Sequence, residues 1–109
     1  MLKGAALKFC ALVTFFFVAY GLIGCAAPKP YKEYTLARAA IQAAEQAEAG
    51  KHASGYWHKA EQEYRAGEKH FERNENEDAR EAFKSAKKFA EKAENVTRLK
   101  KFQSGAGFP

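Results

Sequence analysis

Residues 77–101 read EDAREAFKSAKKFAEKAENVTRLKK, and this stretch decides the fold class. Apolar residues recur in it every three or four positions, which is the spacing of one face of an α-helix. Acidic residues fall in its first turns and basic residues in its last, an order that suits the helix dipole. We therefore predict a long helix from about Glu77 to Lys101, with this apolar face: Ala79, Ala82, Phe83, Ala86, Phe89, Ala90, Ala93 and Val96.

Two shorter helices are predicted before this one. The segment from Glu33 to about Ala49 is rich in alanine, glutamine and glutamate, which favour helices. The segment from about Tyr56 to Arg73 alternates bulky and small residues at heptad spacing, which is typical of a helix packed on neighbours. That heptad stripe consists of Trp57, Ala60, Tyr64, Gly67 and Phe71.

Glycine and asparagine mark the breaks between these helices. Gly50 is of the residue type that most often follows a helix end, so the first break is placed at Gly50–Gly55. Either Asn74 or Asn76 is a candidate cap for the last helix, and Asn74 with Glu77 three residues later resembles a capping box. Both breaks are short, so consecutive helices are expected to run antiparallel.

These elements predict an all-α fold, either an antiparallel helical hairpin or a three-helix, coiled-coil-like bundle. Whether the first helix packs on the other two stays open. Each alanine side chain buries little apolar area, and burial contributes only about 25 cal/mol per Å². We therefore expect a domain of modest stability. Its core should then depend on the aromatic residues Trp57, Tyr64, Phe71, Phe83 and Phe89.

The N-terminal residues 1–24 have the pattern of a secretory signal. Lys3 and Lys8 precede the apolar run Phe9–Ile23, which is short for a spanning helix of about 20 apolar residues. An uncleaved membrane anchor is the alternative interpretation. Cys10 lies inside the apolar run, so cleavage removes it and leaves no second cysteine for a disulfide.

The tetrad Leu22-Ile23-Gly24-Cys25 resembles the lipobox of bacterial lipoproteins. The resemblance implies that the Cys25 thiol receives a diacylglycerol, that the signal is cut before it, and that the new amino group is acylated. Ala26 rather than an aspartate after the cysteine implies sorting to the outer membrane. We therefore expect a lipid-anchored protein that faces the periplasm.

The sequence after the signal divides into three parts. Residues 25–32 form the acylated cysteine and a stiff tether with Pro28 and Pro30, at most about 25 Å long. Residues 33–102 form the alanine-rich helical domain, and residues 103–109 are expected to be a disordered tail. Residues 25–109 are few enough for one small domain only, which argues against a large enzyme cleft.

Charge and motifs narrow the function classes. The formal charge of the whole chain is +5, and removing Lys3 and Lys8 leaves +3, which is mild. His52, His58 and His70 are not clustered in sequence, and no phosphate loop or nucleophile motif is present. We expect no catalytic residue, cofactor, metal site, small-molecule substrate or nucleic-acid partner.

A partner-binding surface is the one candidate site besides Cys25. It consists of Trp57 and the basic residues Lys84, Lys87, Lys88 and Lys92. The alternatives are that Trp57 belongs to the core and that the lysines form a solvated helix face. An envelope protein or a second copy of the chain is the expected partner, alongside membrane lipid at Cys25.

Two weaker resemblances concern the helical part. Residues 36–47, 56, 60–64 and 79–93 resemble an uncharacterised family of bacterial envelope lipoproteins with an alanine-rich helical domain of unknown function. Residues 77–86 resemble the second helix of a tetratricopeptide repeat, although the spacing departs from that repeat. The expected function is a non-enzymatic structural or adaptor element of the envelope, or alternatively a tetratricopeptide-like module that docks an envelope or secretion complex.

Overall fold

The computed structural model describes residues 2–21 and 27–105. They form five α-helices and no strand, which confirms the all-α prediction. The helices are α1 (Leu2–Gly21), α2 (Tyr31–Gln46), α3 (Ala49–His52), α4 (Ser54–Glu72) and α5 (Asn76–Gln103).

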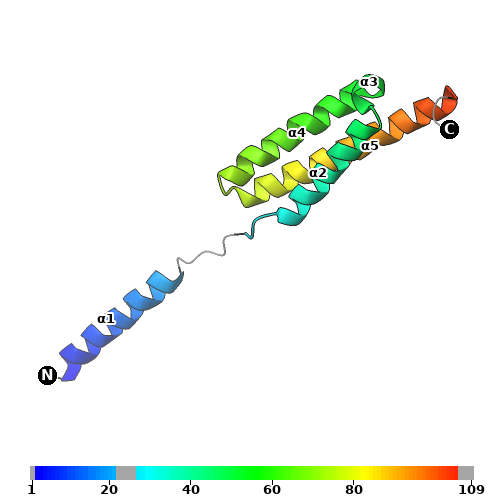
Figure 1. The fold of residues 1–109 in the computed structure, drawn as a ribbon. Coiled ribbons are helices and arrows are strands. Elements are labelled where there is room, and N and C mark those ends of the chain that lie inside the picture. Colours follow the sequence, from blue (N-terminus) through cyan, green and yellow to red (C-terminus); the bar gives the residue numbers. More distant parts are fainter. Residues whose placement is uncertain (1, 22–26, 106–109) are drawn as a thin grey trace.

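Helices α2, α4 and α5 make a three-helix bundle (Figure 1). α4 and α5 form an antiparallel hairpin with the largest interface in the molecule, and α2 packs mainly along α5, in the same direction. The short helix α3 closes one end of the bundle, and the α4–α5 turn closes the other. Of the two predicted architectures, the bundle is therefore the one observed.

The core is built mainly from alanine. Its fully or nearly buried members are Ala37, Ala40, Ala44, Ala49, Ala53, Ala60, Ala79, Ala82, Phe83, Ala86, Ala90 and Ala93. Phe83 is completely buried, whereas Phe89 is only partly buried against alanines. The predicted apolar face of α5 is confirmed, and the alanines let the three helices approach closely.

Aromatic rings join the three helices near the α4–α5 turn. Tyr34 of α2 lies with its ring centroid 5.4 Å from Phe83 of α5 and 6.1 Å from Tyr64 of α4. Burial raises the pKa of Tyr64 above its usual range, and its hydrogen bond with Tyr34 raises this pKa further. Tyr34, which periodicity did not single out, therefore ties α2 to the hairpin.

The first break differs from the prediction at Gly50. α2 ends at Gln46, and the left-handed residue after it is Glu48, with φ 66°. Gly50 lies inside α3, so its prediction as the residue after the helix is wrong. Its small size serves packing instead, because a Cβ on Gly50 would lie 3.4 Å from the indole of Trp57.

The second break differs at Asn74. This residue follows α4 in the left-handed conformation, with φ 59°, so it terminates α4 rather than capping α5. The N-cap of α5 is Glu75, which makes no side-chain capping hydrogen bond. The predicted capping box of Asn74 and Glu77 is therefore wrong.

The segment before α2 is docked on the bundle. Asn76 Nδ2 donates a hydrogen bond to the carbonyl of Ala27 at 2.5 Å, and Arg80 Nη2 donates one to the carbonyl of Pro28 at 3.3 Å. Pro30 is fully buried, and α2 begins at Tyr31 rather than Glu33. Residues 27–30, predicted as part of a stiff tether, therefore form a segment docked at the α4–α5 turn.

Helix α1 contacts none of the other helices in the described parts of the chain. Its large apolar side chains are exposed, with Phe17 79% accessible. Within the described ranges, no helix combines the length and apolar character needed to cross a membrane. At the other end, α5 continues to Gln103, and Ser104–Gly105 form a turn.

Candidate partner-binding groove

An apolar groove of about 530 Å³ lies where α3 and the start of α4 meet α5. Its lining residues are His52, Ala53, Ser54, Gly55, Tyr56, Lys59, Phe89, Val96 and Lys100. Tyr56 is 37% exposed, so the groove is open to solvent. Its lining residues place the groove at the α3 end of the bundle. In Figure 1 this end lies opposite the start of α2, where the docked segment 27–30 is.

Small residues at the start of α4 keep this groove open. A Cβ on Gly55 would meet no atom within 4 Å, so Gly55 borders free space. On α5, Phe89 and Val96 are seven residues apart, which places them on the same face two turns from each other. Both also pack against the buried alanines, so one edge of the core is continuous with the groove.

Lysines border the groove. Lys92 Nζ lies 4.7 Å from the Tyr56 ring centroid, a cation–π contact. Lys59 Nζ lies 5.9 Å from the Phe89 centroid and 3.3 Å from a carboxylate oxygen of Glu63. Lys100 donates a hydrogen bond to the carbonyl of His52. Within residues 27–105, no aspartate or glutamate lines the groove, so its rim is positively charged.

Trp57 belongs to the core beside the groove rather than to its lining. It is partly buried and packs against the cluster of Ala40, Ala44 and Ala60. Its indole also rests on Gly50. This packing favours the interpretation of Trp57 as a core residue, and its partner-binding role stays a prediction.

The four lysines named from the sequence do not gather at the groove. Lys84 pairs with Glu81 at 3.1 Å, and Lys87 pairs with Glu91 at 3.0 Å, both on α5. Lys88 is exposed elsewhere on α5, and only Lys92 adjoins the groove. Lys59 and Lys100 also border the groove, and no pattern in the sequence singled them out.

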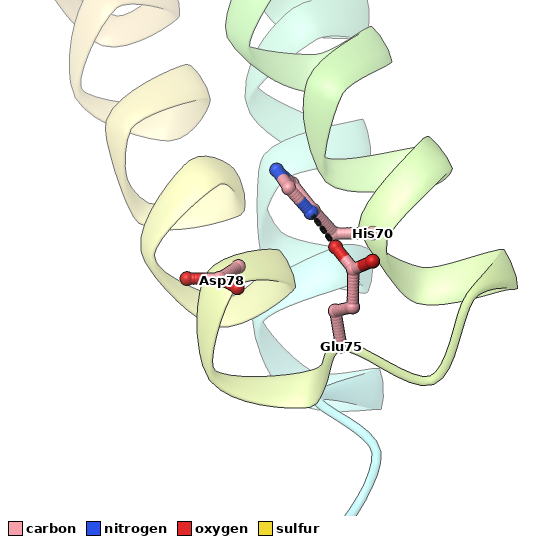
Figure 2. A group of neighbouring side chains, drawn as sticks. All are labelled: His70, Glu75 and Asp78. Atoms are coloured by element: carbon pink, nitrogen blue, oxygen red, sulfur yellow. Dashed lines mark hydrogen bonds and ion pairs between the residues drawn. The ribbon is translucent and has the colours of Figure 1, made fainter.

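A second cluster lies at the opposite end of the bundle, across the α4–α5 turn (Figure 2). Donor atoms of His70, Glu75 and Asp78 lie within 4.8 Å of one another. The His70 and Glu75 side chains share a hydrogen bond and are 35% and 40% exposed. The Glu75 amide also donates to the His70 carbonyl at 2.9 Å, so these contacts account for the cluster as part of the turn.

The lipobox Leu22–Cys25 lies outside the described residues, so lipidation at Cys25 stays a prediction. The first described residue after it is Ala27, whose carbonyl is held by Asn76.

Comparison with known proteins gives a family and no described activity. Neither the curated proteins nor the solved structures gave a match. Residues 32–106 match the family described as "Domain of unknown function (DUF4398)", and this match covers α2 to α5, more than half of the chain. The chain therefore belongs to the DUF4398 family.

Proposed function

We propose that this protein is a non-enzymatic outer-membrane lipoprotein, anchored through acylated Cys25, whose helical bundle is a structural or adaptor element facing the periplasm. The lipobox resemblance and the apolar residues before it support the anchor. The observation that carries the adaptor role is the docked segment 27–30, because it attaches the bundle beside the residue that would hold the lipid.

The docked segment gives a short link between anchor and bundle. Cys25 and Ala27 are two residues apart, which spans at most about 7 Å. Lys29 Nζ lies 4.7 Å from the Phe71 ring, and buried Pro30 follows directly. A bundle held this way has one end at the membrane surface and little freedom to move away from it.

The opposite end of the bundle then faces away from the membrane. α4 has 19 residues and is about 28 Å long, and the groove lies at its first turn. Each acyl-chain CH₂ that enters the bilayer contributes about 0.8 kcal/mol, so two or more chains hold a protein stably at the membrane without further contacts. The bundle is thus free to present the groove to a partner in the periplasm.

A binding module that docks an envelope or secretion complex is the second candidate. The groove favours it, since it offers apolar surface with a basic rim. The two candidates share the anchor, and the second one assigns the binding of a partner to the groove.

The anchor is tested by intact-mass analysis of the membrane fraction from cells that express the full chain. We expect a mature chain that begins at acylated Cys25, and loss of both cleavage and acylation in Cys25→Ser. The matched control is Cys10→Ser, which should be processed like the wild type because this residue lies in the removed signal. An uncleaved chain of full mass in all three proteins would refute the anchor.

The adaptor role is tested by crosslinking the tagged wild-type chain in cells. A discrete crosslinked envelope protein that is lost in Cys25→Ser supports an adaptor that must be at the membrane. A chain that crosslinks to no other protein, and whose deletion leaves the envelope composition unchanged, would contradict it.

A further inference from the structure

We propose that the groove at the α3 end of the bundle binds an extended acidic peptide segment of a periplasmic protein. The segment inserts one apolar side chain between Tyr56, Phe89 and Val96, and its carboxylates pair with the lysines at the rim. This inference deepens the proposed adaptor function and rests on it, because the anchor at the other end determines which molecules can reach the groove.

The apolar part of the groove has room for a large side chain together with neighbouring peptide atoms. Its volume of about 530 Å³ lies within the range of about 300–1,000 Å³ that ligand pockets occupy. Phe89 and Val96 line the groove and are only partly buried, so part of their apolar surface faces the open space beside the first turns of α4. Since Gly55 borders free space, an inserted side chain meets no obstruction at that position.

The positive charge of the groove rim indicates that the ligand carries negative charge. Within residues 27–105, neither Lys92 nor Lys100 has a carboxylate within 4.0 Å, so these cations are not neutralised by the fold. Lys59 contacts Glu63 at 3.3 Å, but Glu63 does not line the groove. Lysines are flexible point charges, so they suit carboxylates at variable positions along a peptide better than one fixed anion.

The position of the groove favours a peptide over membrane lipid. The docked segment 27–30 lies at the other end of α4, about 28 Å away along that helix. A bilayer that holds Cys25 therefore lies at the far end of the bundle from Lys100. The groove is open to solvent, since Tyr56 is 37% exposed, so a long acyl chain bound there would stay partly in contact with water. An apolar peptide side chain is shorter and exposes less apolar surface in such a groove.

The test measures binding of a fluorescent 12-residue probe peptide to the full chain in neutral detergent by anisotropy. The probe has a central leucine flanked by glutamates, and its two comparison peptides carry serine for leucine or glutamine for glutamate. We expect both comparison peptides to bind at least ten-fold more weakly than the probe. Equal binding of all three would overturn the proposal.

Two chain variants place the binding at the groove. A Cβ at Gly55 meets no atom within 4 Å, so Gly55→Trp should place its ring in the groove and abolish binding, whereas its control Gly55→Ala should bind like the wild type. Combined replacement of Lys59, Lys92 and Lys100 by glutamine should weaken binding at least ten-fold. Its matched control, glutamine at Lys84, Lys87 and Lys88, should leave binding unchanged. Probe binding that survives Gly55→Trp, or that both triple variants lose equally, would overturn the proposal.

A lipid ligand gives a different result. Suppose that phosphatidylglycerol vesicles bind the wild-type chain but not Gly55→Trp, and that the acidic probe binds neither. The groove would then be a lipid site, and the peptide proposal would be wrong. The assay also separates this inference from the proposed anchor. Cys25→Ser should bind the probe like the wild type, so a failure of acylation and a failure of the groove are seen independently.

Discussion

Gly67 of α4 packs directly against the ring of Phe83. A Cβ at this position would lie 2.7 Å from two ring carbons of Phe83, which is completely buried and cannot move aside freely. Gly67→Ala gains up to about 1 kcal/mol of helix propensity. The overpacking should cost about 1–3 kcal/mol, so we predict a net loss of stability in urea unfolding.

The matched control for this prediction is Gly55→Ala in the same helix. A Cβ at Gly55 meets nothing within 4 Å, so only the propensity gain should remain, at most about 1 kcal/mol. If Gly67→Ala were as stable as Gly55→Ala, the contact between Gly67 and Phe83 would not be as tight as described.

At Thr97, in contrast, we predict a substitution that makes the folded state more stable. It is completely buried on α5, and its hydroxyl has no hydrogen-bond partner among the described residues. Because an unpaired buried polar group costs stability, Thr97→Val should raise the free energy of unfolding by about 1 kcal/mol. Thr97→Ser keeps the hydroxyl and loses a methyl group, so it should be less stable than the wild type. A destabilised valine variant would show that the hydroxyl is in fact paired.

Residue-scale features were predictable where they depend on spacing alone. The buried alanines of α5 and Phe83 follow from the pattern of residues 79–93. The burial of Thr97 was not predicted, because threonine is polar and a search for apolar spacing does not count it as part of the buried face. The role of Gly67 depends on the Phe83 ring, which comes from another helix.

At the scale of elements, the turn after α2 is held to the end of α5 through Glu48. Its carboxylate lies 3.3 Å from Lys101 Nζ. The hydrogen bond with Lys101, and then the charges of Lys51 and Lys101, lower the pKa of Glu48 below its usual value of 4.5. A lowered pKa in the folded state means that this contribution to stability is present above about pH 4.5 and is lost as the pH falls through the folded-state pKa.

We therefore predict that Glu48→Gln makes folding less sensitive to acid. The variant should be slightly less stable than the wild type at pH 7, and this difference should shrink below the ordinary glutamate pKa. Circular dichroism of thermal unfolding at pH 7 and pH 3 checks it, with Lys101→Gln expected to behave alike. A difference that stays constant with pH would show that the ion pair does not contribute.

The docked segment gives a second prediction at this scale. Asn76→Ala removes the hydrogen bond to the Ala27 carbonyl, so the amides of Ala27 and Lys29 should become more mobile on the ps–ns timescale. NMR relaxation order parameters measure this change. Asn95→Ala, an exposed asparagine on the same helix, is the control and should leave those amides unchanged. Unchanged order in both variants would argue that the other contacts of the segment, at Pro28, Lys29 and Pro30, are enough to hold it.

Local sequence rules located the helices but misassigned what ends them. α4 and α5 lie close to their predicted bounds, since heptad spacing and terminal charges are local signals. Glycine is the usual residue after a helix, yet Glu48 occupies that position and Gly50 instead makes room for Trp57. Likewise, Asn74 was predicted to start α5 and in fact ends α4. At the first turn, the packing of Gly50 against Trp57 accounts for the difference, and local sequence rules carry no information on that contact.

At the scale of the whole molecule, the arrangement of α2 and the groove depends on which helix covers which face. Periodicity identified an apolar face on each helix but did not tell whether α2 packs on the hairpin, which the ring of Tyr34 settles. The groove lies where α3 and the first turns of α4 meet Phe89 and Val96 of α5. Its position therefore depends on the break between α2 and α4, and the breaks were the least predictable part of the sequence.

The central claim, a bundle attached at the α4–α5 turn with its groove facing away from the membrane, is tested most directly by energy transfer. The acylated chain is reconstituted in vesicles that carry acceptor dyes on their headgroups, with one donor dye at Arg73→Cys or at Asn95→Cys. Residues 76 to 95 of α5 span about 28 Å, so transfer should be much stronger from position 73 than from position 95. Equal transfer from the two positions would mean that the bundle lies along the membrane, and it would contradict the account.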